Sequence, residues 1–335
     1  MTKTFRFILA AGVSCAVLAG TAAGQQKLAQ TGMKFLNVGA DARAAALGDA
    51  VTSLEGSAPS MFANPASMAR LTDFASVSLA RTQWIAEITH NYGSVAFAPW
   101  NGEYGVIGVF VQAVDYGVFQ ETILDQGTQG FLDLGTFRPT AAVFGIGYAR
   151  ALNNQFSVGG NLKYARQSLG DATVQLGQDP QARQGNSVGV AAFDLGILYK
   201  TGFKSLNFGM SVRNFAREIY FQKEGFQLPL TFKIGISMDV ADLADIDHEM
   251  HGLLITMDAE HPRDYFEQVH VGAEYVFMKI LALRVGFTSP ADEYNISYGL
   301  GLHKAFEGLG FGLDYAYTPF GVFGGVHRFS FDFSL

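Results

Sequence analysis

The sequence predicts an all-β membrane protein: a 14-stranded antiparallel transmembrane β-barrel with a short N-terminal helical plug. Three observations carry this prediction. Apolar and polar residues alternate in runs of about 10 to 13 residues from Phe74 to the end of the chain. Short and long links between these runs follow one another in turn. Residues 38–71 are instead helical in pattern, and they precede all the expected strands.

The composition fits many long strands in a membrane. Of 335 residues, 39 are Gly, 13% are aromatic and only 16% are charged, against about 25% charged residues in soluble domains. The formal net charge of −7 provides no basic stripe that could neutralise phosphates. Nucleic acid is therefore excluded as a partner.

Residues 1–24 have the three parts of a secretory signal peptide. Lys3 and Arg6 precede an apolar stretch, which small residues follow up to Gly24, where we expect cleavage. The only cysteine, Cys15, lies in the apolar stretch, so the exported chain would carry no disulfide. Beyond this leader no run of 18 apolar residues occurs, and a membrane would have to be crossed by strands.

We expect residues 25–73 to form a periplasmic plug, or hatch, that contains two short helices. Asp41 can cap the first helix, which Gly48 ends. Asn64 can cap the second helix, with Pro65 at the first helical position, where a missing N–H costs nothing. Such short helices need a surrounding wall to persist. The candidate site residues are the plug motif Asn64, Pro65 and Ala66.

Residues 74–335 are expected to form the barrel. A soluble sandwich also alternates, but its strands are typically about 5 to 6 residues long. Runs of about 10 to 13 residues, at ~3.3 Å per residue and a tilt near ~40°, span the ~25 Å apolar band of an outer membrane. The strands are expected to begin near Phe74, Asn91, Gly102, Thr140, Asn154, Ser187, Ser205, Pro229, Gly252, Gln268, Ile280, Tyr294, Leu309 and Gly325.

The links between the strands predict the orientation of the barrel. Bacterial barrels alternate short periplasmic turns with longer outer loops. The tight links fall at residues 101–102, 153–154, 201–202 and 278–279, and the long links fall at residues 115–138, 170–186 and 217–228. Both termini are then periplasmic, and the last strand has to pair with the first, because lipid cannot satisfy an open edge.

The inward face of the barrel is expected to carry charges of both signs, so the lumen is no one-sign ion filter. These residues are Lys163, Asp194, Arg213, Lys233, Asp239, Glu274, Arg284, His303, Asp314, Arg328 and Asp332. The simpler interpretation is that they pair with one another and with the plug. The alternative is that some of them line a ligand path.

Two local motifs give no support for chemistry. The G-x-S-x-G match at residues 185–189 opens an alternating strand, whereas a nucleophile elbow needs a strand-to-helix turn. A second cluster could hold a divalent cation, but its simpler role is to solvate a periplasmic turn. It comprises Asp245, Asp247, His248, Glu249 and His251. We expect no enzymatic activity, no cofactor and no bound metal.

The link over residues 115–138 is unusually apolar for a loop. Its large apolar residues are Phe119, Ile123, Leu124, Phe131, Leu132, Leu134 and Phe137. Apolar groups at this density usually meet a surface. Two interpretations remain open: the loop folds back over the barrel mouth, or it contacts a partner protein.

Three segments of the plug resemble the entry motif of the PorV/PorQ family of outer-membrane proteins. They are GMKFL at residues 32–36, ARAAALGDA at residues 42–50 and FANPA at residues 62–66. That family is similar to the FadL-type transporters, which share the Asn-Pro-Ala motif and a barrel with an N-terminal hatch.

The resemblance implies a role in type IX secretion at the outer membrane, in which the protein receives or shuttles exported proteins. Its partners would be outer-membrane lipid, translocon subunits and cargo proteins. FadL-like passage of hydrophobic small molecules is the alternative, and a structural role outside secretion is a third.

Overall fold

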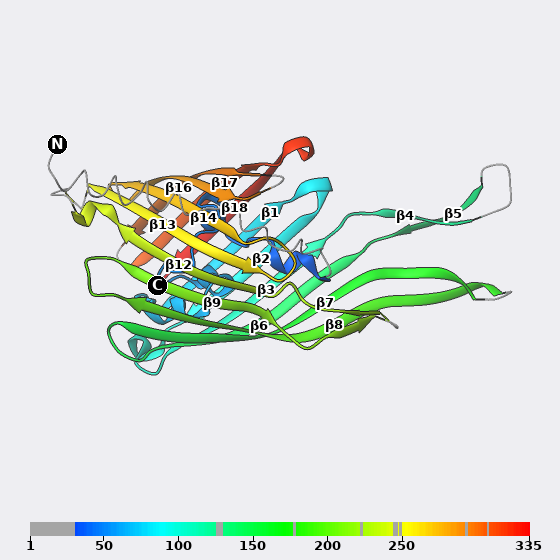
Figure 1. Ribbon diagram of the computed structural model, residues 1–335, viewed down its shortest axis with the longest axis horizontal. Helices are drawn as coiled ribbons and strands as arrows, with labels where there is room; N and C mark the ends of the chain where they lie inside the picture. The colour runs from blue at the N-terminus through cyan, green and yellow to red at the C-terminus, as the bar shows by residue number, and fades with distance from the viewer. Residues whose placement is uncertain are drawn as a thin grey trace.

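The computed structural model describes residues 31–124, 130–176, 179–221, 224–243, 247, 250–291, 294–306 and 308–335. The expected signal peptide lies outside the described residues. Fourteen of the described strands form one closed barrel, and four others pair as two separate hairpins (Figure 1). Within the described residues, no helix has the length and apolar character that a membrane span requires.

Each of the fourteen expected strands is present, and neighbouring strands are antiparallel. They are β1 (Ala75–Gln83), β2 (Thr89–Phe97), β3 (Val106–Asp115), β6 (Thr140–Ala151), β7 (Phe156–Leu176), β8 (Asp179–Lys200), β9 (Asn207–Phe215), β12 (Thr231–Asp239), β13 (His251–Pro262), β14 (Gln268–Phe277), β15 (Leu281–Ser289), β16 (Ile296–Phe306), β17 (Leu309–Pro319) and β18 (Gly325–Ser334).

The first and last strands close the barrel. Strand β18 pairs with β1 in a register that sets Ser334 opposite Ser76 and His327 opposite Gln83. Closure leaves no strand edge facing lipid, which is the condition for spanning a membrane with strands. The prediction that the chain end pairs with the first strand is confirmed.

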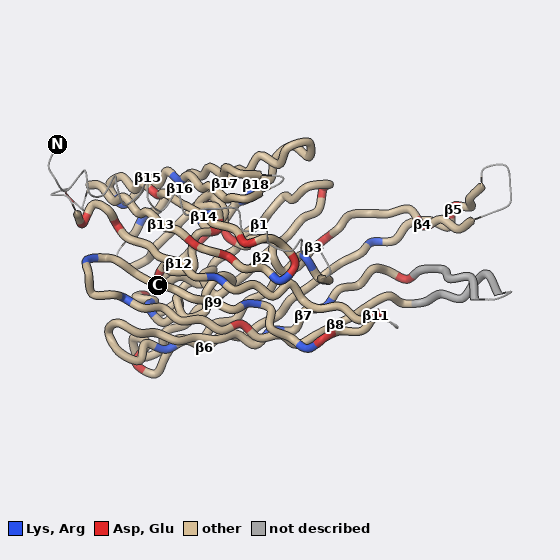
Figure 2. Tube along the Cα trace, viewed as in Figure 1, with Lys and Arg blue, Asp and Glu red and all other residues tan. Residues whose placement is uncertain are grey.

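Alternation along the strands separates a lipid face from a lumen face. In β3, Ile107, Val109 and Val111 are exposed, while the alternating residues Phe110 and Gln112 are buried. Lys, Arg, Asp and Glu are sparse along the barrel trace (Figure 2). The outward apolar band is thus the surface that hydrocarbon would cover.

Short helices lie in the N-terminal segment and in the links. The N-terminal ones are η1 (Lys34–Asn37), α2 (Ala42–Ala46), η2 (Ala58–Phe62) and η3 (Pro65–Arg70). The links carry η4 (Ile85–Glu87), η5 (Pro99–Gly102), η6 (Val240–Leu243) and η7 (Gly321–Phe323). Since η5 ends at Gly102 and a turn follows it, β3 starts four residues later than the alternation predicts.

Residues 31–73, hereafter the plug, pack within the barrel. Helix α2 contacts β15 to β18, while η3 contacts β6, β7 and β8 on another part of the wall. Both predicted caps form: Asp41 accepts from the backbone N–H groups of Arg43 and Ala44, and Asn64 accepts from that of Ala66. The second helix is a 3₁₀-helix.

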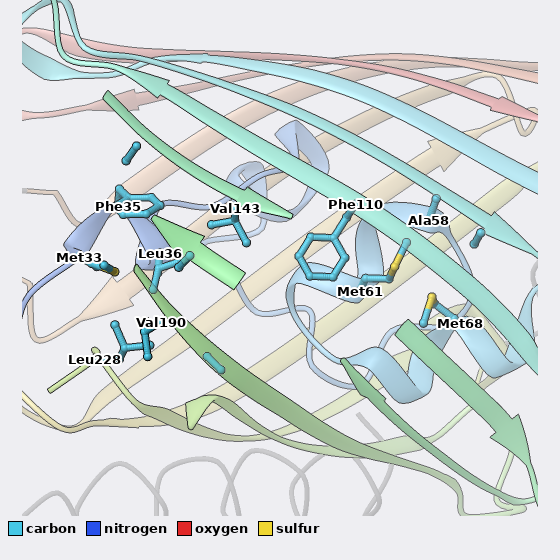
Figure 3. Packing of buried hydrophobic residues seen from close by; sticks show 14 of the residues in the cluster. Met33, Phe35, Leu36, Ala58, Met61, Met68, Phe110, Val143, Val190 and Leu228 are labelled. Atoms are coloured by element: carbon cyan, nitrogen blue, oxygen red, sulfur yellow. The ribbon is translucent and has the colours of Figure 1, made fainter. Parts of the chain in front are cut away.

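Apolar side chains of the plug and the wall form a shared core. Met61 and Met68 of the plug lie near Phe110 of β3 (Figure 3). Gly108 of the same strand provides the space, because a Cβ atom there would stand 2.4 Å from the Met61 sulfur. At the other end of this core are Met33, Phe35 and Leu36 of the plug, and Leu228 lies beside Val190 of β8 (Figure 3).

The plug is not confined to the periplasmic mouth, and that part of the expectation is wrong. Its first described residue, Thr31, forms a parallel bridge with Gln227 in the long link between β9 and β12. Thr31 and Lys34 also bond to Asp264, in the link between β13 and β14. Both links lie at the end of the barrel that carries the long loops, hereafter the outer end. The buried Asp264 carboxylate at this end needs a cationic partner, and Lys34 supplies it.

The apolar link after β3 does not fold back over the mouth, so that interpretation is wrong. It forms a hairpin of β4 (Phe119–Leu124) and β5 (Phe131–Phe137), which extends away from the barrel (Figure 1). The two strands hydrogen-bond to each other, so their backbone groups need no partners from the barrel wall. A smaller hairpin of β10 (Ile219–Phe221) and β11 (Glu224–Phe226) occupies the next-but-one outer link.

Candidate functional site

The candidate site is the contact between the plug and the lumen wall, and the predicted motif lies within it. Asn64 is fully buried; its Nδ2 donates to the carbonyl oxygen of Thr52 at 2.7 Å and to that of Ile197 on β8 at 2.9 Å. Its Oδ1 accepts from the N–H of Ala66 at 3.1 Å. One amide thus caps η3, ties two parts of the plug together and fixes both to the wall.

Glycines of the wall let the motif approach so closely. A Cβ atom at Gly196 would stand 1.9 Å from Asn64 Oδ1, and one at Gly159 would stand 2.6 Å from the backbone of Pro65. These strand glycines carry no side chain on the lumen face, and the plug therefore contacts the wall backbone directly at their positions.

A second attachment is ionic. Arg43 of α2 donates to both carboxylate oxygens of Glu274 on β14, at 2.9 Å and 2.6 Å. Arg284 on β15 donates to the same carboxylate at 2.5 Å and also to Asp314, which accepts from His303 at 3.0 Å. The network links α2 to four neighbouring strands, β14, β15, β16 and β17.

Two further ion pairs lie on the lumen wall. Lys163 donates to Asp194 at 2.7 Å and to the Asn214 side chain at 2.6 Å. Lys233 lies 2.8 Å from Glu260. For the residues in these networks, the interpretation that lumen charges pair with one another and with the plug is confirmed.

Sequence reasoning missed three polar residues of this wall. Glu260 lies 3.0 Å from His270 Nε2, and His270 Nδ1 donates to the Gly48 carbonyl of the plug at 2.7 Å. Asp258 accepts from the N–H of Thr52 at 3.0 Å. The signal was present, since both acids occupy the inward positions of an alternating strand, β13.

Burial affects the titration of the plug. Burial, together with the Asp314 carboxylate, raises the pKa of Asp41 above its ordinary value. The Glu274 carboxylate raises the pKa of Arg43, which keeps that guanidinium charged. Burial raises the pKa of Tyr294, in the link between β15 and β16, to about 12, so its hydroxyl stays neutral.

The plug leaves two cavities in the lumen. The larger, of about 340 Å³, extends to Asp264 and Tyr294 in the outer links. The other, of about 310 Å³, reaches Lys279 in the short turn between β14 and β15, at the opposite end of the barrel. Both are lined by the same plug residues at their common boundary, namely Asp41, Arg43, Ser57 and Pro59. The plug can therefore interrupt a path through the barrel at this boundary.

The two motifs that sequence analysis set aside lie away from this site. Ser187 of the G-x-S-x-G match lies within β8, with no helix after it. In the acidic cluster, His251 Nδ1 bonds to the hydroxyl of Tyr275 at 2.7 Å, and Asp247 accepts from two backbone N–H groups. Asp245, His248 and Glu249 lie outside the described residues.

Solved structures resemble this chain in fold. The CymD monoaromatic hydrocarbon channel is 15% identical, with a TM-score of 0.57 over 89% of this chain and 97% of the channel. The toluene transporter TbuX of Ralstonia pickettii is 11% identical, with a TM-score of 0.57 over 89% and 98%. The toluene transporter TodX of Pseudomonas putida is 9% identical, with a TM-score of 0.57 over 88% and 96%. At these identities the likeness shows the fold alone.

Comparison at the sequence level identifies a family. No curated protein matches the chain. Residues 133–333, well over half of the chain, match the family model described as type IX secretion system membrane protein PorP/SprF. The implied connection with type IX secretion is confirmed at this level, and the family and the fold together indicate the outer membrane. The chain belongs to the PorP/SprF family of type IX secretion system membrane proteins.

Proposed function

We propose that this barrel receives exported proteins at the outer membrane and passes them on to the surface machinery of type IX secretion, as the PorV/PorQ resemblance implies. The β4–β5 hairpin is the observation that carries the proposal. Family membership supports the secretion system as its setting, and the hairpin supplies a surface that a protein partner can use.

The hairpin exposes apolar side chains that its own fold leaves uncovered. Leu124 is 89% exposed, and Phe119, Phe131 and Leu132 are each about half exposed. The two strands form a sheet of their own, so each presents one unpaired edge. Such edges recruit extended segments of other chains by strand addition, and apolar patches add affinity.

The position of the hairpin also supports the proposal. It follows β3 at the outer end and reaches beyond the barrel (Figure 1). An isolated two-stranded hairpin is at best marginally stable in water. Contact with a partner would therefore stabilise it, which fits a surface used in protein transfer.

Replacement of residues 119–137 by a short Gly-Ser turn tests the proposal. We expect the barrel to fold unchanged, because the hairpin pairs with no barrel strand, and we expect pull-down of the detergent-solubilised protein to lose cargo or translocon subunits. The matched control is Val322→Ser with Phe323→Ser, which removes exposed apolar groups from another outer link. Recovery of the same proteins without the hairpin would contradict the proposal.

Passage of hydrophobic small molecules is the second candidate, favoured by the fold shared with the hydrocarbon channels. The lining of the lumen cavities counts against it, since Asp49, Arg213 and Glu260 face the larger one. A purified protein that carries bound fatty acid and no protein partner would favour this candidate over the secretion role.

A further inference from the structure

The larger lumen cavity is lined by charges, and most of them have partners. Its ion-paired residues are Lys34 with Asp264, Arg43 with Glu274, Glu55 with Lys200 and Lys233 with Glu260. Asp41 caps α2 and accepts from Ser330. Apart from Asp41, the lining charges without an ion pair in the described part of the chain are Asp49 and Arg213.

Arg213, on β9, keeps most of its hydrogen-bonding capacity unused. Its Nη2 donates to the carbonyl oxygen of Leu36 at 3.2 Å, while its Nε is buried and makes no hydrogen bond to a described residue. A guanidinium presents five N–H donors in a planar fork that matches a carboxylate. One carbonyl contact holds this side chain at the cavity wall and leaves N–H groups of its two outer nitrogens, Nη1 and Nη2, available to a ligand.

Asp49, in the plug, presents the opposite charge to the same cavity. Its backbone has a left-handed φ of 62°, and its carbonyl oxygen accepts from Lys233 at 3.3 Å. The carboxylate packs beside Gly39, where a Cβ atom would stand 2.9 Å from Oδ1. It makes no hydrogen bond to a described residue. Asp49 lines the cavity, so this carboxylate can meet a ligand there.

We propose that the larger cavity binds a small zwitterion of the amino acid or short peptide class, with its carboxylate on Arg213 and its ammonium on Asp49. Both residues are half-buried and have no ion pair among the described residues, and each charge would be neutralised by one end of such a ligand. A simple anion would leave Asp49 unpaired, and a simple cation would leave Arg213 unpaired. This inference goes beyond the proposed secretion role and does not depend on it.

The volume and the remaining lining fit a ligand of this size. A cavity of about 340 Å³ lies at the lower end of the range for small-molecule pockets, about 300 to 1,000 Å³. Tyr294, whose hydroxyl stays neutral, and Gln112 add polar groups to the wall. The link between β13 and β14 and the strand residues beside it, Pro262 and Gln268, contribute to the same lining. The site therefore lies toward the outer end.

Titration calorimetry with the detergent-solubilised full chain tests the proposal, with alanylalanine as the probe. We expect alanylalanine to bind at least tenfold more tightly than its N-acetyl form, which lacks the ammonium, or its C-terminal amide, which lacks the carboxylate. Equal binding of the capped and uncapped forms, or no heat with alanylalanine at millimolar concentration, would overturn the proposal.

Variants assign each end of the ligand. Arg213→Gln should weaken the binding of alanylalanine at least tenfold and leave the binding of its C-terminal amide unchanged. Asp49→Asn should also weaken the binding of alanylalanine at least tenfold, but leave the binding of its N-acetyl form unchanged. Such non-additivity marks a direct contact. Glu55→Gln is the matched control, because that carboxylate lines the cavity but is already paired with Lys200. A loss of alanylalanine binding in this control as large as in Asp49→Asn would refute the assignment.

A further variant guards against loss of folding. Gly39→Ala adds a Cβ against the Asp49 carboxylate without changing any charge. This variant should weaken the binding of alanylalanine and leave the binding of the N-acetyl form unchanged. Each variant is first shown to keep the mobility of a folded barrel on unheated gels. A folded Gly39→Ala protein with wild-type preference for alanylalanine would count against the placement of the ammonium.

Discussion

Replacing Arg43 by Met should release α2 from the barrel wall. The change removes two charge-assisted hydrogen bonds to Glu274, at 2.9 Å and 2.6 Å. Each such bond contributes about 1.5 to 3 kcal/mol. The lower value applies here, because the Arg43 side chain is 33% exposed and Glu274 keeps its bond to Arg284. The total loss is about 3 kcal/mol.

That loss should appear as opening of the lumen. Since Arg43 lines the boundary shared by the two cavities, displacement of α2 would connect them. Each loss of about 1.4 kcal/mol changes the equilibrium between the closed and open states by a factor of ten. A loss of about 3 kcal/mol therefore raises the open population roughly 100-fold. Single-channel recording in planar lipid bilayers measures this as the frequency of opening events.

The matched control for this experiment is Lys200→Met. Lys200 pairs with Glu55 of the plug at 2.8 Å, but both side chains are partly exposed, at 39% and 29%. An exposed pair contributes about 0 to 1 kcal/mol, so openings should increase at most a few-fold. If Arg43→Met opens no more often than Lys200→Met, α2 does not close the lumen and the reasoning is refuted.

Three further predictions concern the plug. Asn64→Ala with Pro65→Gly removes the bonds of the buried amide and should raise single-channel conductance; unchanged conductance would mean that η3 does not occlude the lumen. Burial raises the pKa of Asp41 above 3.8, so the folded protein keeps this proton to higher pH and the free energy of unfolding falls as pH rises from about 3.8 through the raised pKa. Asp41→Asn, which preserves a capping side chain, should therefore gain Tm relative to wild type as pH rises above about 3.8 in thermal melts, and a pH-independent difference would contradict this. Gly209→Ala puts a Cβ 2.2 Å from a plug carbonyl oxygen and should cost about 1 to 3 kcal/mol in denaturant unfolding, whereas Gly252→Ala, with its nearest contact at 3.7 Å, should cost less than Gly209→Ala.

The sequence predicts those parts of the fold that local patterns determine. Alternation is a property of each strand alone, so all fourteen barrel strands could be found, and capping by Asp41 or Asn64 depends on the next few residues. The inward charges follow from the same alternation, which assigned Lys163 and Glu274 to the lumen.

The remaining features depend on contacts between distant residues. The pairing of Glu260 with Lys233 depends on the register of two strands, which alternation alone does not determine. The depth of the plug depends on contacts such as Thr31 with Gln227, almost two hundred residues apart in the chain. The direction of the β4–β5 hairpin also escapes local patterns, because apolar side chains fit a folded-back loop as well as a projecting one.

A designed disulfide tests most directly the central claim that the N-terminal segment fills the barrel. Thr52 is fully buried in the plug, and a Cβ atom at Gly235 of β12 would stand 3.1 Å from its Cβ. A disulfide needs about 3.5 to 4.5 Å, which a shift of a few tenths of an ångström between the two Cβ atoms provides. The Asp258 carboxylate, whose Oδ1 stands 2.1 Å from the same Cβ position, has to rotate away. Cys15, in the expected leader, is the only native cysteine.

The measurement is crosslinking of Thr52→Cys with Gly235→Cys by mild oxidation in membranes, with Thr52→Cys and Ile236→Cys as the control. Ile236 neighbours Gly235 but is exposed on the lipid face, so the wall separates it from the plug. We expect the first pair to form an intramolecular disulfide, seen as a mobility change on non-reducing gels, and the control pair to stay reduced. A first pair that stays reduced in the folded protein would contradict a plugged lumen.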